Sequence, residues 1–151
     1  MSSLLVPRVP ASAALVRRAM TAELQARHLP VTEVDDAALV VSELVGNAVR
    51  HGAELPGGGL LARWQLHGSQ QEGTQLRVEV VEGGPGPGPQ AGRADSDAES
   101  GRGLELVRAI AARWGSRAAP DGTAVWAELP VTCPPPGGPA GRAGRVADPG
   151  S

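Results

Sequence analysis

The sequence has few of the aromatic residues that commonly fill a protein core. It contains no phenylalanine and no tyrosine, and three tryptophans make up the 2% of its 151 residues that are aromatic. Glycine and proline are abundant instead, with 21 and 14 copies. A chain of this length usually forms one domain. We therefore expect a single core, built mainly from leucine, valine and alanine.

Cysteine, long apolar runs and excess charge are also scarce. Cys133 is the single cysteine, which excludes an intramolecular disulfide or a site with several cysteine ligands and favours a reducing cytoplasm. No apolar run approaches the roughly 20 residues that span a bilayer. Residues 4–6 weakly resemble a secretion signal, but Pro7 and Arg8 interrupt the run, so we do not expect export. A net charge of −2 gives no general attraction to nucleic acid.

Two amphipathic helices are predicted in the first third of the chain. Residues 12–29 carry apolar side chains at helical spacing, and the pattern closes before Pro30. A second helix is predicted to begin after Thr32, a suitable cap, and to run toward Gly52. Both helices present an apolar stripe, so each is expected to cover a sheet.

Alternating apolar and polar residues predict three strands. Residues 60–67 and 76–80 are expected to pair as an antiparallel hairpin, and residues 122–130 form the last strand. An apolar stripe from Leu104 to Trp114 predicts a third helix directly behind Gly103. The pattern thus mixes helices and strands within one domain.

Two segments are too poor in apolar residues to pack. Residues 83–102 contain mostly glycine, proline, aspartate and serine, and their length favours a mobile lid or a binding loop. Residues 132–151 are rich in proline, glycine, alanine and arginine, and are predicted to be a disordered tail. The expected domain therefore covers residues 1–131.

The second helix carries an acid and an amide one turn apart. Glu43, Asn47 and Arg50 fall on one side, opposite an apolar stripe. A carboxylate, a neutral oxygen ligand and a cation suit a metal-bound nucleotide, whereas the alternative is an ordinary solvated helix face. Asparagine has low propensity for a helix interior, which favours the binding site.

Two glycine segments add weaker signals. Gly101 and Gly103 at a helix start leave backbone N–H groups open to a phosphate, and Arg102 adds a cation. Glu82, followed by glycines, can accept a hydrogen bond from the amino group of a flat heterocycle such as adenine. Each segment alone is more often a simple turn, because such short motifs recur by chance.

Together, these motifs resemble the histidine-kinase/Hsp90-like (GHKL) ATPase superfamily, and specifically its small bacterial anti-sigma-factor serine/threonine kinases. The pattern E-L-x-x-N-A-x-x-H-G is matched in full by Glu43, Leu44, Asn47, Ala48, His51 and Gly52. The pattern D-x-G-x-G is matched by Gly84 and Gly86, with Glu82 where aspartate is expected. A second glycine box resembles Gly101, Arg102, Gly103 and Leu104, and the closing strand contains Thr123 and Trp126. The likeness covers about residues 4–130.

The resemblance implies a Bergerat ATP-binding fold. This is a two-layer α/β (α+β) sandwich, in which helices cover one face of a mixed, mostly antiparallel sheet. It also implies Mg²⁺ and ATP as cofactors, with Asn47 as the Mg²⁺ ligand and Glu43 as the general base. Nucleotide-binding positions carried over from the family are Asn47, Arg50, Glu82, Gly84, Gly86, Gly101, Arg102, Gly103, Leu104 and Thr123.

The implied function is binding of a sigma factor, phosphorylation of an anti-anti-sigma protein, or both; a homodimer is also compatible with the family. The alternative is a non-catalytic, nucleotide-gated module that binds a protein partner. Glu82 is one methylene longer than aspartate, so its carboxylate must retract or the adenine must shift. Thr123 either assists Glu82 through a shared water or serves as an ordinary strand residue. His51 is expected to contact carbonyls at the helix end.

Overall fold

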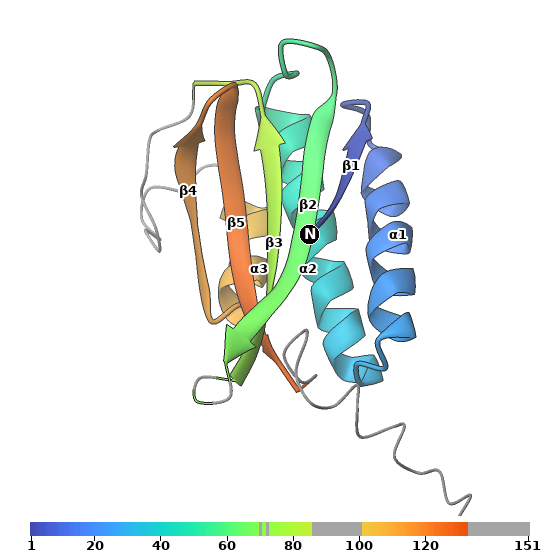
Figure 1. Cartoon of the computed structure of the whole chain (residues 1–151). Coiled ribbons are helices and arrows are strands. Elements are labelled where there is room, and N and C mark those ends of the chain that lie inside the picture. Colours follow the sequence, from blue (N-terminus) through green and yellow to red (C-terminus); the bar gives the residue numbers. More distant parts are fainter. Residues whose placement is uncertain (70, 72, 86–100, 133–151) are drawn as a thin grey trace, which may run out of the picture.

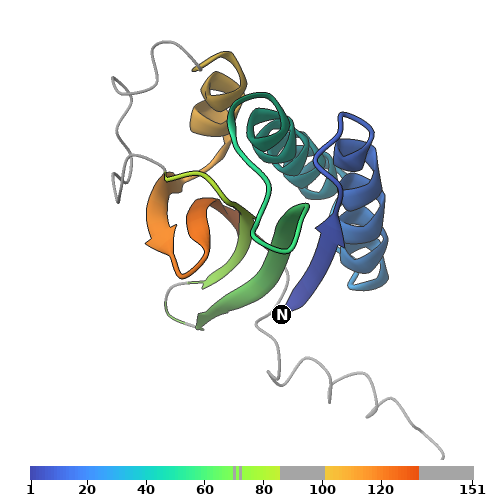
Figure 2. The same ribbon diagram turned by 90° about the horizontal axis from the view of Figure 1, so that it is seen from above.

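The protein folds as two layers, a five-stranded sheet and three helices that cover one face of it (Figure 1, Figure 2). The computed structural model describes residues 1–69, 71, 73–85 and 101–132, with residues 101–103 described by their backbone alone. This architecture confirms the predicted two-layer α+β sandwich. The predicted tail lies outside the described residues apart from Thr132, and the predicted lid lies outside them apart from its two ends.

The helices are α1 (Ser12–Ala26), α2 (Val31–His51) and α3 (Gly101–Ile110). Helix α1 ends three residues earlier than expected, and His28 takes a left-handed φ of 64° as the chain turns. Helix α2 begins at Val31 after an extended Pro30, so the predicted cap at Thr32 is wrong. Thr32 instead lies in the first turn, and no side chain caps the helix. None of the helices among the described residues has the length and apolarity to cross a membrane.

The sheet has the strand order β1-β2-β3-β5-β4. The predicted strands appear as β2 (Leu60–Ser69), β3 (Gly73–Glu82) and β5 (Gly122–Val131), which form the centre of the sheet. Strands β1 (Ser2–Val6) and β4 (Arg113–Ala119) lie at its edges. All four pairings between the described strands are antiparallel, where the resemblance implied a mixed, mostly antiparallel sheet.

Both edge strands were missed by the sequence patterns. The apolar stripe that predicted a helix as far as Trp114 was wrong at its end, because α3 stops at Ile110 and Trp114 pairs with Ala127 of β5. The apolar residues keep a spacing of three and four residues from α3 into β4 by chance. Pairing with β5 nevertheless makes the later residues a strand. Residues 4–6, weighed only as a signal-like run, belong to β1 and pair with β2.

The core lies between the sheet and the helices. Its fully buried side chains include Met20 and Leu24 of α1, Leu44 of α2, Leu60 of β2 and Val78 of β3. Because alternate strand residues face opposite sides, β3 turns Val78 and Val80 toward the helices and Arg77 and Glu79 away from them. The same alternation in β5 sets up two chemically different faces of one sheet.

Candidate functional site

A cavity of about 330 Å³ lies between the last turns of α2 and the adjoining ends of β3 and β5, at the end of the sheet that is uppermost in Figure 1. Ligand pockets typically have volumes of this order or larger. Its lining residues are Leu44, Asn47, Ala48, His51, Gly52, Val80, Glu82, Gly84, Pro85, Thr123 and Val125. The helix that carries the first motif and the strand that leads into the first glycine box therefore form one site.

Strand register explains the floor of the cavity. Glu82 pairs with Thr123, and two residues away on the same face Val80 pairs with Val125. One cross-strand pair supplies polar groups and the next supplies apolar ones. A flat heterocycle with polar edges suits this combination, since its faces meet valine side chains while an edge meets a carboxylate and a hydroxyl.

Asn47 supplies the most informative atom of the site. Its side-chain oxygen Oδ1 is buried and has no hydrogen-bond partner among the described residues. A buried polar atom left unpaired costs free energy, so the oxygen is suited to a ligand or a cation. The described residues offer no group of three or more histidine, cysteine, aspartate or glutamate side chains that could hold a metal. Mg²⁺ often takes only one or two protein oxygens together with substrate phosphates, and Asn47 fits that role.

Glu43 and Arg50 do not line the cavity. Glu43 is half-buried one turn before Asn47 on α2, whereas Arg50 is exposed. The Arg50 guanidinium folds back along its own helix, because a Cβ on Gly46 would lie only 3.2 Å from Arg50 Nη1. The structure therefore assembles the heterocycle end of the predicted site more completely than its phosphate end.

Glu82 folds back onto the backbone around it. Its Oε1 accepts a hydrogen bond from the Gly84 N–H at 2.8 Å, and its Oε2 accepts from the N–H groups of Ala53 and Gly84, each at 3.2 Å. The side chain is buried, with 7% of the residue exposed. The expectation that the longer side chain retracts or that the adenine shifts stays a prediction. Neither hydrogen-bond donor carries a charge, and Oε1, which accepts one hydrogen bond, has lone-pair capacity left.

Two glycines make room for this carboxylate. A Cβ on Gly52 would lie 2.6 Å from Glu82 Oε2, and a Cβ on Gly84 would lie 2.6 Å from Glu82 Oε1. Both distances are shorter than real contacts allow, so an alanine at either position displaces the carboxylate. Sequence reasoning treated Gly52 as the end of a helix and gave it no role in the site.

Further hydrogen bonds join the segments around Glu82. The Gly83 N–H donates to the Ala53 carbonyl at 2.8 Å, and the Ala53 N–H donates to Glu82, so the second residue after α2 is held at the end of β3. The Thr123 hydroxyl donates to the Gly84 carbonyl at 2.9 Å. The hydroxyl oxygen can still accept a hydrogen bond from a ligand or a water.

The remaining predicted residues fall into three groups. Gly86 lies outside the described residues. The backbone of residues 101–103 forms the first turn of α3, which packs against α2. Leu104 is buried in the hydrophobic core and is absent from the cavity lining, so it supports the site through packing.

Sequence reasoning gave no binding role to the apolar walls or to His51. Val80 and Val125 form the floor, Leu44 and Ala48 supply the helix wall, and His51 contributes to the rim. The two valines were predictable in principle, since each stands two residues along its strand from Glu82 or Thr123 and must share its face. His51 was interpreted as a helix-end residue, and the structure adds a place in the lining.

A family model describing the histidine kinase-like ATPase domain matches residues 6–129. The match runs from Val6, the last residue of β1, to Leu129 of β5, so it includes every element from α1 to β4, most of β5 and all the residues that line the cavity. No curated protein matches the chain at a significant level.

Proposed function

Because the chain belongs to the histidine kinase-like ATPase domain family, we propose that it is an ATP-binding regulatory protein of the anti-sigma-factor serine/threonine kinase type. Family membership supports the ATP-binding part of this proposal. The motif match over Glu43 to Gly52 favours the small-kinase type. Its partner is then a sigma factor or an anti-anti-sigma protein, and the cytoplasm is its location.

The observation that carries the proposal is the unpaired Asn47 Oδ1 beside the cavity. On the opposite wall, Glu82 and Thr123 provide a carboxylate and a hydroxyl. One side therefore suits a Mg²⁺-bound polyphosphate and the other suits a purine with an amino group. A nucleoside triphosphate suits this cavity better than an apolar ligand does, because Asn47 Oδ1 has no partner among the described residues and Glu82 and Thr123 can each accept a further hydrogen bond.

Glu43 is our candidate general base. It precedes Asn47 by one helical turn, so both side chains project from the same side of α2. A half-buried carboxylate there can accept the proton from a substrate serine or threonine hydroxyl. Arg50 and Arg102 are candidates to offset charge on the transferring group. Bound Mg·ATP would supply that phosphoryl group.

Replacement of Glu43 by alanine tests the kinase proposal. We expect Glu43→Ala to bind Mg·ATP with an affinity within about threefold of wild type, since its side chain does not line the cavity, while phosphoryl transfer falls by at least about 100-fold. Titration calorimetry measures binding, and transfer of labelled phosphate to a purified anti-anti-sigma protein measures activity. The matched control is Asp36→Ala, which removes an exposed carboxylate from the same helix. Transfer at the wild-type rate by the Glu43 variant would exclude Glu43 as the base.

A second candidate function is a non-catalytic module whose partner binding depends on nucleotide. The contacts of Glu82 favour it, because its carboxylate already accepts hydrogen bonds from Ala53 and Gly84. Calorimetry and the transfer assay separate the two candidates when applied to the wild-type protein. Binding of Mg·ATP without transfer supports the module, and binding with transfer supports the kinase. Absence of any titration heat overturns both.

A further inference from the structure

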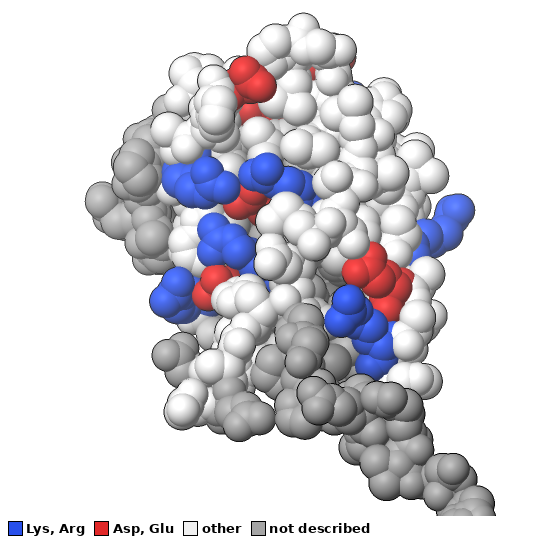
Figure 3. All heavy atoms as spheres, in the orientation of Figure 1, with Lys and Arg blue, Asp and Glu red and all other residues white. Residues whose placement is uncertain are grey.

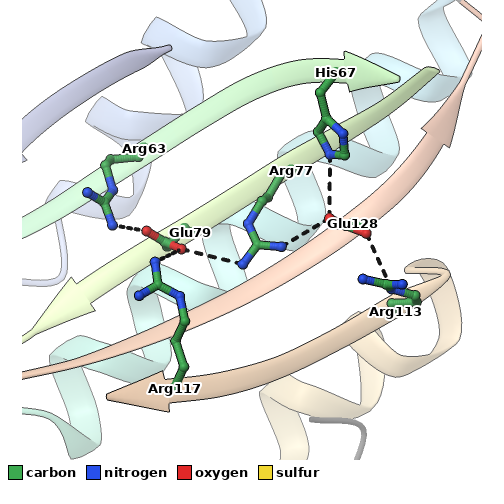
Figure 4. A network of polar contacts seen from close by, with 7 residues as sticks. All are labelled: Arg63, His67, Arg77, Glu79, Arg113, Arg117 and Glu128. Carbon is green, nitrogen blue, oxygen red and sulfur yellow. Dashed lines mark hydrogen bonds and ion pairs between the residues drawn. The ribbon is translucent and has the colours of Figure 1, made fainter. Parts of the chain in front are cut away.

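The face of the sheet that the helices leave open carries a cluster of charged side chains on four strands (Figure 4). We call it the arginine cluster. It consists of Arg63, Arg77, Arg113 and Arg117 with the two carboxylates between them, Glu79 and Glu128. These residues face away from the nucleotide cavity, since they alternate along β3 and β5 with the residues that form its floor.

Cross-strand neighbours surround Glu79. It pairs with Arg63 across β2 and β3, and its Oε1 lies 2.8 Å from Arg117 Nη2 and 3.7 Å from Arg77 Nη2. Only 5% of the residue is exposed. Three arginines from three strands thus enclose one carboxylate, which fixes their guanidinium groups on the open face.

Glu128 occupies a similar position on β5. Its carboxylate lies 3.0 Å from Arg77, 3.3 Å from Arg113 and 3.4 Å from His67. Arg77 therefore bridges both carboxylates, and its guanidinium carbon also stacks 4.4 Å from the ring centre of Trp126. Arg113 approaches the same ring at 5.9 Å. Stacking and ion pairing together hold these long side chains in place.

The cluster has more positive than negative charge. Four guanidinium groups surround two carboxylates, although the whole chain has a net charge of −2. The Arg113 side chain is 69% exposed and that of Arg117 is 42% exposed, against 29% for both Arg63 and Arg77. Figure 3 shows the resulting group of blue side chains, with red between them, on the strand side of the molecule. The accessible excess charge therefore lies on the edge strand β4.

We propose that the arginine cluster docks an acidic segment of a partner protein, with Arg113 and Arg117 each binding a carboxylate. The two arginines are four residues apart on one face of β4, about 13 Å along the strand. An extended acidic segment with carboxylates four residues apart has the same spacing. Guanidinium groups already held in place lose little conformational entropy on binding, which favours such a contact.

A nucleic acid fits this face less well than an acidic polypeptide. A phosphate backbone carries closely spaced charges and needs a longer basic track than two strongly exposed arginines. Glu79 and Glu128 also lie at the centre of the face, where they oppose continuous negative charge. Two separate carboxylates, in contrast, require two separate cations. The proposal does not depend on phosphoryl transfer, since the cluster and the cavity lie on opposite faces.

The test uses the full chain and a labelled probe peptide in which glutamate alternates with threonine over twelve residues. We expect fluorescence anisotropy at about 50 mM salt to show binding of this peptide and none of the matching glutamine–threonine peptide. The double variant Arg113→Gln/Arg117→Gln should bind the acidic peptide at least tenfold more weakly. The matched control, Arg18→Gln/Arg108→Gln, removes two exposed arginines from α1 and α3 and should change affinity less than twofold.

Two outcomes would overturn the proposal. One is unchanged affinity of the acidic peptide for the β4 double variant, or equal losses in that variant and its helical control. The other is tighter binding of a twelve-nucleotide single-stranded DNA, lost in the same β4 variant, which would assign the face to nucleic acid. The single variant Arg113→Gln guards against misfolding, because its side chain is the most exposed in the cluster. It should weaken peptide binding at least threefold with an unchanged circular dichroism spectrum, and unchanged affinity would count against the proposal.

Discussion

Three glutamates are buried to almost the same degree on the two faces of one sheet, and different groups satisfy them. Glu79 and Glu128 on the open face are 5% and 8% exposed, and Glu82 beside the cavity is 7% exposed. Arginines surround the first two. Glu82 instead receives hydrogen bonds from the backbone N–H groups of Ala53 and Gly84.

The carboxylates of Glu79 and Glu128 are neutralised by their partners, whereas that of Glu82 is only held in position. A guanidinium donates hydrogen bonds to a carboxylate and also cancels its negative charge. The carboxylates of Glu79 and Glu128 on the open face are therefore both hydrogen-bonded and neutralised. Neutral amides orient the Glu82 carboxylate without cancelling its charge, and no cation among the described residues pairs with it. Glu82 can therefore still attract a hydrogen-bond donor. A residue that recognises the amino group of a purine needs this property.

The largest effect is expected when the open-face network loses a carboxylate. Glu79→Gln leaves Arg63, Arg77 and Arg117 close together without their common counter-charge. We expect the free energy of unfolding to fall by about 3 kcal/mol, the lower end for breaking a buried ion pair, because water partly screens these arginines. Urea denaturation measures the change. Asp36→Ala, at an exposed position, should stay within about 0.5 kcal/mol of wild type. Equal effects of the two changes would remove the contrast between the faces.

A smaller loss of unfolding free energy is expected when a methyl group is added beside the cavity. Gly52→Ala puts a Cβ 2.6 Å from Glu82 Oε2 and 2.8 Å from the Ala48 carbonyl, while the backbone φ of −96° is open to alanine. The cost is therefore steric, about 2 kcal/mol in unfolding free energy, and ATP affinity should fall with the displaced carboxylate. Thermal unfolding and calorimetry measure both. Gly57→Ala is the control, since a Cβ there meets no atom within 4 Å. If both alanines behave alike, Gly52 does not hold space for Glu82.

The central elements of this fold were predictable because their signals are local. Strict alternation in β2, β3 and β5 and the apolar stripes of α1 and α2 follow from side-chain geometry within each segment. The edge strand β4 was not predictable in this way. Its residues Arg113 and Trp114 continue a helical spacing, and only pairing with β5 makes them a strand. The local periodicity of these residues fits either a helix or a strand, and pairing with β5 selects the strand.

The candidate site was predictable in its members and less so in its geometry. The family resemblance implied that Asn47, Glu82 and Thr123 belong to one site, and all three line the cavity. The hydrogen bonds of Glu82 depend on the backbone of Ala53, a residue 29 positions earlier with no distinctive side chain. Any residue type except proline offers such an N–H group. A sequence pattern therefore contains no signal for it.

The smallest effect should come from the same substitution on the cavity side, Glu82→Gln. Oε2 of Glu82 accepts hydrogen bonds from both Ala53 and Gly84, and an amide oxygen in that position keeps both, whereas the amide nitrogen replaces Oε1 and loses the 2.8 Å hydrogen bond from the Gly84 N–H. We expect a loss of only about 1 kcal/mol in unfolding free energy, since one hydrogen bond is lost and no cation in the described part of the chain pairs with Glu82. ATP affinity should fall at least tenfold, because the amide places an N–H donor where the amino group of the adenine needs a hydrogen-bond acceptor. Urea denaturation and calorimetry test the two parts separately, with Glu79→Gln as the matched control of opposite pattern: a large loss of stability and little direct effect on nucleotide. If Glu82→Gln loses as much stability as Glu79→Gln, the negative charge of Glu82 is neutralised within the folded protein. Glu82 would then have no uncompensated charge with which to attract a ligand.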